Sequence, residues 1–321
     1  MAVVVVILMY GLWSSMFSLA KVALAYSPPI FLTSARMLIA GLILLSYLAF
    51  TNRSSFKLKK KQILSLALLA LFSIYLTNVL EFWALQYLSA AKACFIYSLS
   101  PFFAAFFSYL HFGERMNIKK WIGLSLGVVG IIPVLYLQTG AEDLWTAFGF
   151  LSWPALAIIA AALFSVYGWV ILRLTVKDQM VSPVMANGMS MLFGGLLALS
   201  HSMFVESWSP LPGFLGPVSS GNFAPFTCWT LIMTLISNII CYNLYGMMLK
   251  KFTATLLSFL GLLSPIFASF HGYLFLNEPI SWTIFLSTAL VSIGLWIVYS
   301  AELKQGYIAQ SKPVISKQSL Q

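Results

Sequence analysis

The sequence predicts an all-α integral membrane protein with ten transmembrane helices in two inverted five-helix repeats and with both termini in the cytoplasm. Three observations predict this fold: an apolar composition, basic residues in every second loop, and a repeat within the chain. Of the 321 residues, 60% are hydrophobic and only 8% are charged, whereas about a quarter of the residues of a soluble domain are charged. Most of the surface is therefore expected to face lipid.

Ten apolar stretches are each long enough to span a bilayer, which takes roughly 20 residues. They cover residues 2–25, 29–50, 63–86, 90–111, 117–137, 150–172, 183–204, 226–248, 253–276 and 281–300. The first stretch has no basic residues before it and is too long for the apolar part of an ordinary signal peptide, so we expect it to be retained. The polar segment 301–321 is expected to be a cytoplasmic tail.

The loops between these stretches differ strongly in charge. Fifteen of the 18 Lys and Arg residues follow the second, fourth, sixth, eighth and tenth stretches, and the other loops contain none. Because loops rich in Lys and Arg stay in the cytoplasm, we expect a multi-pass protein of the cell inner membrane with both termini inside. The net charge of +10 then reflects topology in a lipid bilayer and not a nucleic-acid partner.

The chain repeats itself at a spacing of 164 residues. Residues 99–114, LSPFFAAFFSYLHFGE, align with 263–278, LSPIFASFHGYLFLNE, and nine of the 16 positions are identical. Chance similarity between apolar helices would rarely match Pro, Tyr and Glu in register. Each repeat, expected at 2–137 and 150–300, holds five helices, so the second enters the membrane from the opposite side. Such inverted repeats are typical of secondary carriers with a site near the bilayer midplane.

A proline lies midway along the fourth and the ninth predicted helix, at Pro101 and Pro265. Each removes one backbone donor and frees the carbonyl four residues earlier, at Tyr97 and Gly261. Free carbonyls are tolerated at membrane depth only where protein or a wet cavity satisfies them. Two compatible interpretations remain: a kink that improves packing, and a hinge that lines a substrate cavity.

A helix with a central proline and a terminal glutamate, present twice, resembles the EamA-type carriers of the drug/metabolite transporter superfamily. Residues 11–24, GLWSSMFSLAKVAL, are similar to the first-helix pattern of that family, with Trp13 and Lys21 in matching places, and Arg36 matches a recurrent arginine. The resemblance covers about residues 5–300 and implies transport of a small organic metabolite. It does not name the substrate, because the family carries amino acids, drugs and nucleotide-related metabolites.

The fourth helix departs from the family pattern, since it opens with Lys92 where small apolar residues are usual. The third helix also carries Glu81 near its outer end. With these features the chain looks similar to the S-adenosylmethionine carriers that obligate intracellular bacteria have within this family. The resemblance implies S-adenosylmethionine uptake in exchange for S-adenosylhomocysteine.

Four charged residues lie inside predicted helices, at Lys21, Arg36, Glu81 and Lys92. Charges in membrane segments are costly and are functional candidates by default. Snorkelling to the interface explains Lys21 and Lys92 equally well, whereas the deeper Arg36 and Glu81 are expected in the protein interior. The excess of positive charge suits a substrate carboxylate, and Glu81 suits an ammonium or sulfonium group.

Polar and aromatic side chains in the helices are further candidates for substrate binding. They would line a cavity and stack on an aromatic ring such as adenine, although Asn and Tyr in apolar helices also hold neighbouring helices together. The candidates of this kind are Trp13, Asn78, Tyr97, Trp169, Asn238, Tyr242 and Tyr245.

Several classes of function are not expected. The sequence has no nucleotide-binding loop, no nucleophile triad and no His or Cys residues at metal-ligand spacing, so we expect no ATP hydrolysis, no cofactor and no metal. The leading hypothesis is a secondary transporter that works by alternating access, with export of amino acids or related metabolites as the alternative to S-adenosylmethionine exchange. An intramembrane lipid-linked transferase is a remote alternative. The sequence leaves direction, coupling ion and oligomeric state open.

Overall fold

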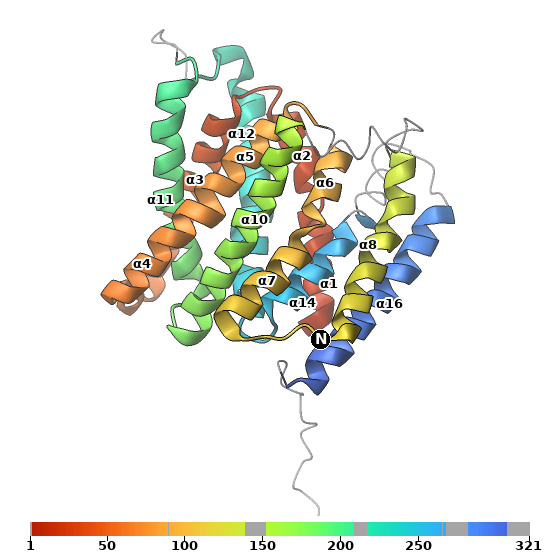
Figure 1. Ribbon diagram of the computed structural model, residues 1–321. Coiled ribbons are helices and arrows are strands. Elements are labelled where there is room, and N and C mark those ends of the chain that lie inside the picture. Colours follow the sequence, from red (N-terminus) through yellow and green to blue (C-terminus); the bar gives the residue numbers. More distant parts are fainter. Residues whose placement is uncertain are drawn as a thin grey trace, which may run out of the picture.

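The computed structural model describes residues 2–88, 90–138, 152–208, 217–264, 266–267 and 282–306. Within these ranges the chain is helical and forms ten successive segments, several of which are broken into shorter helices (Figure 1). Seven of the described segments are long and apolar enough to cross a membrane. The prediction of an all-α membrane protein is therefore confirmed.

The first five segments contain nine helices and lie close to the predicted stretches. A 3-10 helix, η1 (Arg53–Phe56), follows the second segment. The bounds in chain order are α1 Ala2–Trp13, α2 Met16–Ala23, α3 Pro29–Thr51, α4 Lys60–Leu69, η2 Ala70–Leu76, α5 Thr77–Leu85, α6 Ala90–Tyr97, α7 Ser100–Phe112 and α8 Ile118–Gln138.

The last five segments follow the same plan over the described residues. A short 3-10 helix, η4 (Ser220–Asn222), precedes the eighth segment. The bounds are α10 Trp153–Arg173, η3 Leu174–Asp178, α11 Pro183–Val205, α12 Phe223–Met233, η5 Thr234–Cys241, α13 Tyr242–Met248, α14 Ala254–Leu260, η6 Gly261–Leu263 and α16 Trp282–Lys304.

The bundle has two ends, which the loop composition distinguishes. The N-terminus of α1 lies beside the start of α8 and the end of α16, at the bottom of Figure 1. The loops that carry the basic residues, after α3, α7, η3 and α13, lie at this end as well. We call it the basic end and the other the opposite end.

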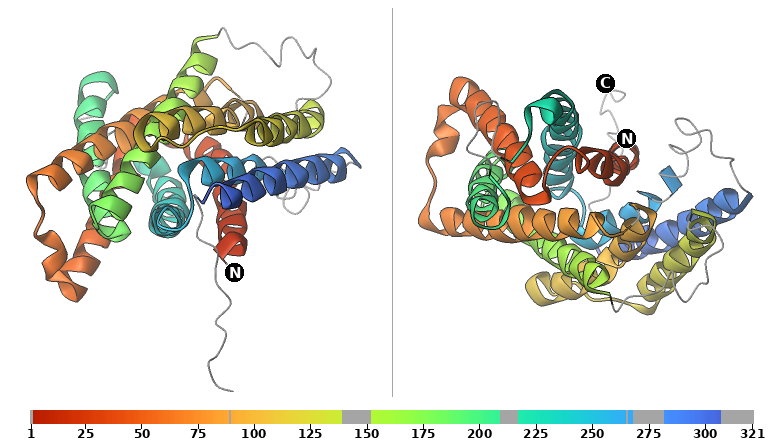
Figure 2. Two further views of the ribbon diagram at one scale, coloured as in Figure 1. Left: turned by 60° about the horizontal axis from the view of Figure 1, so that its bottom comes forward. Right: turned by 90° about the horizontal axis from the view of Figure 1, so that it is seen from above.

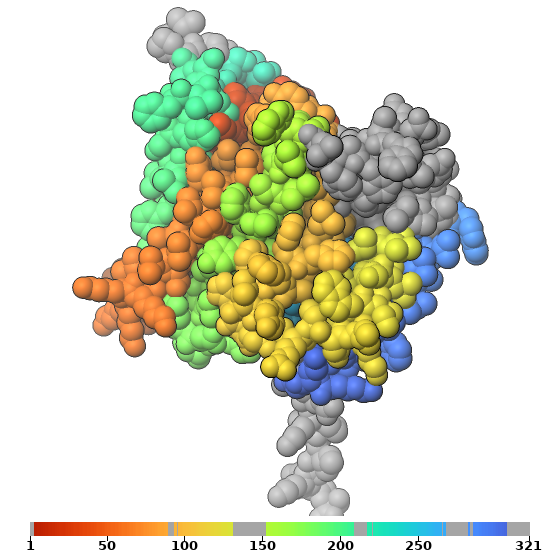
Figure 3. Space-filling view, viewed as in Figure 1, coloured from red at the N-terminus to blue at the C-terminus, as the bar shows by residue number. Residues whose placement is uncertain are grey.

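The outer faces of the helices carry large apolar side chains. Phe50 on α3 is 87% exposed and Phe204 on α11 is 90% exposed. Figure 3 shows one such outer face, where α7, α8 and α10 lie side by side and α4 projects at the lower left. A soluble protein rarely leaves so much apolar surface open, and a bilayer covers it.

Close helix packing relies on glycines in two helix pairs, α3 with α11 and α8 with α16. A Cβ on Gly123 of α8 would lie 2.8 Å from the carbonyl oxygen of Gly294 on α16, and a Cβ on Gly294 would lie 2.6 Å from the carbonyl oxygen of Gly123. Only glycine allows the two backbones this approach. Figures 1 and 2 show α8 and α16 side by side at the edge of the bundle.

The third and eighth segments each contain a stretch of π-helix, η2 and η5, which begin 164 residues apart at Ala70 and Thr234. An asparagine follows each stretch and satisfies the carbonyls that the wider turn leaves free. Asn78 Nδ2 donates to the carbonyls four and five residues earlier, at 2.8 and 3.3 Å. Asn243 Nδ2 does the same at 2.9 and 3.3 Å. Turns of this kind are frequent at functional sites.

The fourth segment breaks between α6 and α7, directly before Pro101. The carbonyl of Tyr97 loses its helical donor because proline has none, and Ser100 Oγ donates to it instead at 2.5 Å. The ninth segment changes to the 3-10 helix η6 at the corresponding place. Pro265 lies outside the described residues.

Candidate functional site

A cavity of about 100 Å³ lies between the helices of both halves of the chain. Its wall comes from α1, α2, α3, α5, α6, α7, α10, η5, α13, α14 and η6. The broken first, fourth and ninth segments and the two segments with π-helix all contribute to it. The places where the helices deviate from regular geometry are therefore also the places that shape the cavity.

Two charged residues lie in the described part of the wall, Arg36 and Glu81. Arg36 is 2% exposed, and its Nη2 donates to Asn78 Oδ1 at 2.5 Å. Its guanidinium carbon also lies 4.7 Å from the ring centre of Phe82. Glu81 lies three residues after Asn78 on α5 and is close enough to interact electrostatically with Arg36. The cavity thus presents one fixed cation and one carboxylate.

The hydrogen bonds of Arg36 leave room for a ligand. Its Nε is buried and has no hydrogen-bond partner among the described residues. A guanidinium binds carboxylates well because it offers several donors in a fixed plane. Arg36 is therefore held by Asn78 on one side and retains a donor for a bound anion.

Aromatic rings form a second part of the wall. Trp13 packs against Tyr242, with ring centres 5.3 Å apart, and Phe17 packs against Tyr97 at 5.8 Å. Trp169 lies on α10 across the cavity. Such rings bind flat heterocycles by stacking and hold cations over their faces.

Hydroxyl groups form the third part of the wall, and the sequence gave no reason to single them out. They come from six elements and can exchange hydrogen bonds with a polar ligand. They belong to Thr77, Ser98, Ser100, Ser165, Ser237, Ser258 and Ser264.

The structure brings most of the candidate residues together. Those named from the sequence that line the cavity are Trp13, Arg36, Asn78, Glu81, Tyr97, Pro101, Trp169 and Tyr242. Tyr245 is 1% exposed and lies behind the wall, where its ring packs against Trp13 and Trp169 at 5.8 and 4.9 Å.

Three other candidates lie elsewhere or outside the description. Lys21 Nζ donates to the carbonyl of Leu88 at 2.5 Å, at the end of the third segment. Asn238 Nδ2 is directed at the sulfur atom of Met37, at 3.0 Å. The side chain of Lys92 lies outside the described residues, as does Pro265.

Asn243 is a residue that sequence reasoning missed. It lies 165 positions after Asn78 and makes the same two backbone contacts. The internal repeat could have pointed to it. A face drawn through Asn238, Tyr242 and Tyr245 assumes regular α-helix, and the π-helix η5 changes which residues share a face.

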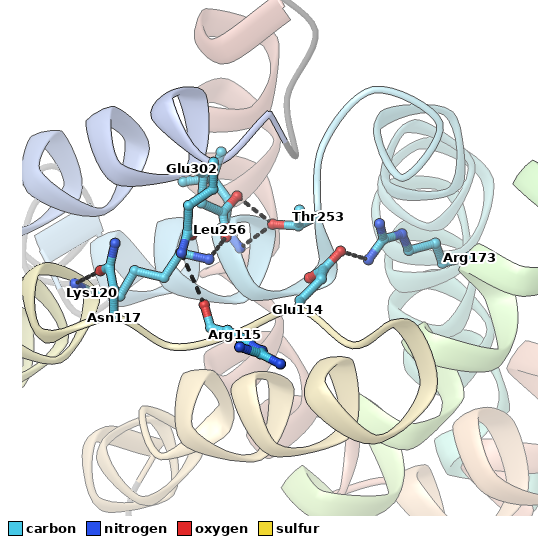
Figure 4. A network of polar contacts seen from close by, with 9 residues as sticks. Glu114, Arg115, Asn117, Lys120, Arg173, Thr253, Leu256 and Glu302 are labelled. Atoms are coloured by element: carbon cyan, nitrogen blue, oxygen red, sulfur yellow. Dashed lines mark hydrogen bonds and ion pairs between the residues drawn. The ribbon is translucent and has the colours of Figure 1, made fainter.

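Buried ion pairs link the helices at the basic end (Figure 4). Arg173 Nη1 lies 2.6 Å from Glu114 Oε1, and Lys120 Nζ lies 3.2 Å from Glu302 Oε1. Thr253 Oγ1 donates to Glu302 Oε2 at 2.6 Å. This network connects the ends of α7, α8, α10, α14 and α16.

A carboxylate organises the opposite end in another way. Glu206, after α11, accepts hydrogen bonds from the backbone nitrogens of Ile30 and Phe31 at 2.7 and 2.8 Å. Ser202 Oγ also donates to Glu206, at 2.6 Å. A negative charge is favourable at the start of a helix, so Glu206 fixes the N-terminus of α3 to the end of α11.

Comparison with known proteins agrees with this architecture. The EamA-like transporter family matches the chain twice, over residues 1–136 and 152–300. The S-adenosylmethionine/S-adenosylhomocysteine transporter of Chlamydia muridarum is 39% identical over 313 residues, which cover 97% of this chain and 96% of the relative. YedA, an uncharacterized inner membrane transporter of Escherichia coli, is 24% identical over 96% of this chain and 92% of its own.

A solved structure with 19% sequence identity superimposes with a TM-score of 0.72, over 95% of this chain and 98% of that chain. At this level of identity the likeness concerns the fold alone. The two matches to the family model together span most of the chain. The protein thus belongs to the EamA-like transporter family.

Proposed function

We propose that the protein takes up S-adenosylmethionine across the inner membrane in exchange for S-adenosylhomocysteine. Its family consists of transporters, so the chain is a multi-pass membrane transporter and not an enzyme. The observation that carries the proposal is the cavity, which combines Arg36, Glu81, aromatic rings and hydroxyl groups. The 39% identity to the chlamydial transporter supports the same substrate pair.

Each part of S-adenosylmethionine has a matching part of the wall. Its carboxylate suits the guanidinium of Arg36, and its sulfonium suits the carboxylate of Glu81. Its adenine suits the rings of Trp13, Trp169 and Tyr242. The ribose suits the surrounding hydroxyls. An amino acid would use Arg36 and Glu81 and leave the aromatic rings and most hydroxyls without a ligand.

For the transport cycle we propose two inverted repeats, 2–137 and 150–300, that rock around this cavity. The family model matches the chain twice, and the π-helices η2 and η5 begin 164 residues apart. The cavity wall draws on both halves. Pro101 and Pro265 then act as hinges in the broken fourth and ninth segments.

The orientation follows from the loop charges. The basic end is cytoplasmic, since it carries the Lys- and Arg-rich loops, and the polar tail 301–321 follows it. The buried pairs Arg173–Glu114 and Lys120–Glu302 hold the helices together at this end. The described conformation is therefore the one that is closed toward the cytoplasm.

Counterflow in proteoliposomes tests the substrate. Purified protein is reconstituted into vesicles loaded with S-adenosylhomocysteine, and the uptake of labelled S-adenosylmethionine is followed. We expect saturable uptake that depends on the internal substrate and that excess aromatic amino acids do not inhibit. Absence of uptake, or equal counterflow with amino acids inside, would exclude this substrate pair.

A further inference from the structure

The two proposed substrates differ by one charge. S-adenosylmethionine carries a carboxylate, an ammonium and a sulfonium and has a net charge of +1 near neutral pH. S-adenosylhomocysteine carries a neutral thioether and has no net charge. An exchange of one for the other would therefore move one positive charge per cycle unless another ion compensates.

We infer that Glu81 carries this compensating proton: it meets the sulfonium as a carboxylate and accompanies S-adenosylhomocysteine in its protonated form. The inference rests on the proposed exchange and adds proton transport to it. In one cycle, one S-adenosylmethionine cation moves inward, and one S-adenosylhomocysteine and one proton move outward. No net charge then crosses the membrane.

The surroundings of Glu81 suit this role. The titratable or charged groups that face it from neighbouring elements are Arg36 on α3, Cys94 and Tyr97 on α6, and Tyr242 on α13. Of these described groups only Arg36 carries a charge. Lys21, on α2, directs its Nζ to a backbone carbonyl at the end of the third segment.

Arg36 is already engaged, because Asn78 accepts a hydrogen bond from its guanidinium and the substrate carboxylate takes a further donor. The sulfonium is then the group that balances the Glu81 carboxylate. With S-adenosylhomocysteine bound this positive charge is missing, and an unbalanced carboxylate in an apolar cavity is costly. A proton replaces the lost charge, so that the loaded site has the same net charge in both directions.

Proteoliposomes loaded with S-adenosylhomocysteine and an internal pH indicator test the inference. On addition of S-adenosylmethionine we expect the interior to become alkaline by one proton per substrate taken up, and we expect the initial rate to be independent of an imposed potassium diffusion potential. Exchange without a pH change, at a rate that follows the potential, would overturn proton coupling and leave the proposed function intact. Absence of exchange would instead overturn the proposed function.

The variant Glu81→Gln assigns the proton to this residue, since glutamine resembles the protonated glutamate. We expect exchange of labelled for unlabelled S-adenosylhomocysteine to continue within about twofold, while S-adenosylmethionine uptake falls about tenfold or more, the effect of losing a charge-assisted contact. The matched control is Asp178→Asn, which removes an exposed carboxylate after α10 and is expected to leave both exchanges and the pH signal unchanged.

Two results would contradict the assignment to Glu81. One is S-adenosylmethionine exchange by Glu81→Gln with the full proton signal. The other is loss of both exchanges, because the glutamine side chain should support the neutral substrate. The proton signal of the unmodified protein decides proton coupling whichever way the variant behaves.

Discussion

The third and eighth segments use the same backbone device with different chemistry. Each has a π-helix followed by an asparagine that donates to the freed carbonyls. In the first half, Asn78 Oδ1 accepts from Arg36 Nη2. In the second half, Asn243 Oδ1 accepts from Asn187 Nδ2, at 3.1 Å. The device is common to both halves, and the group it positions is charged in only one of them.

This difference indicates how the two halves divide the work of recognition. Within the described residues, the charged groups of the cavity wall come from the first half, on α3 and α5. The second half contributes Trp169, Tyr242 and four of the serines. The first half is therefore expected to recognise the ionic part of the substrate and the second half mainly to shape and hold the ring.

Replacing the positioned group in each half should give the largest contrast. Arg36→Gln removes the cation that faces the substrate carboxylate, and we expect S-adenosylmethionine uptake to fall on the order of 100-fold, as for a lost bond to a charged group. Asn187→Ala removes a neutral hydrogen bond outside the cavity wall and should reduce uptake about twofold. Initial rates in proteoliposomes at equal protein content measure both.

The matched control for charge is Arg53→Gln, an exposed arginine at the basic end, which should transport like the unmodified protein. Equal losses in Arg36→Gln and Asn187→Ala would contradict the division between the halves.

Removing the asparagines should produce an intermediate effect. Asn78→Ala leaves Arg36 without its partner, and we expect the KM for S-adenosylmethionine to rise about tenfold, because a hydrogen bond to a charged group is worth roughly 1.5–3 kcal/mol. Asn243→Ala loosens the corresponding turn and should lower thermal stability while KM stays within about twofold. Concentration series of uptake, together with melting curves, separate the two. A similar rise of KM in both variants would show that the halves are equivalent.

The smallest effect concerns the broken helices. Ser100→Ala leaves the Tyr97 carbonyl without the hydroxyl that satisfies it, and we expect a loss of about 1 kcal/mol of stability, seen as an earlier thermal transition. Ser100→Thr keeps the hydroxyl and serves as the control. Ser264 takes the corresponding place in the repeat, so an equal loss in Ser264→Ala would indicate the same arrangement in the ninth segment. An unchanged transition in Ser100→Ala would contradict the role given to the hydroxyl.

Much of the fold follows from the chain because lipid imposes simple constraints. Apolar length predicted the helices, and Pro101 predicted the break in the fourth segment. The break between α1 and α2 has no proline and was not predicted. The π-helices were not predicted either, since a wider turn depends on the Asn78 and Asn243 side chains finding particular carbonyls.

The candidate site was predictable where the residue type is unusual in a membrane. Arg36 and Glu81 stand out because a charge in an apolar helix needs a reason. The serines of the wall could not be singled out, because hydroxyls also serve routinely as contacts between membrane helices. Asn238 was named on the assumption of a regular helix, and in the structure it lies against the sulfur of Met37 instead.

The buried pairs at the basic end bear on leakage. Glu114 and Glu302 are 5% and 0% exposed, and separating such pairs leaves charges without partners, which costs several kcal/mol. A bound substrate can offset that cost only by binding better to the opened form. The empty protein has no such compensation, so its return across the membrane is expected to be slow. A cell that depends on an imported metabolite thereby avoids losing it through its own transporter when no exchange partner is present.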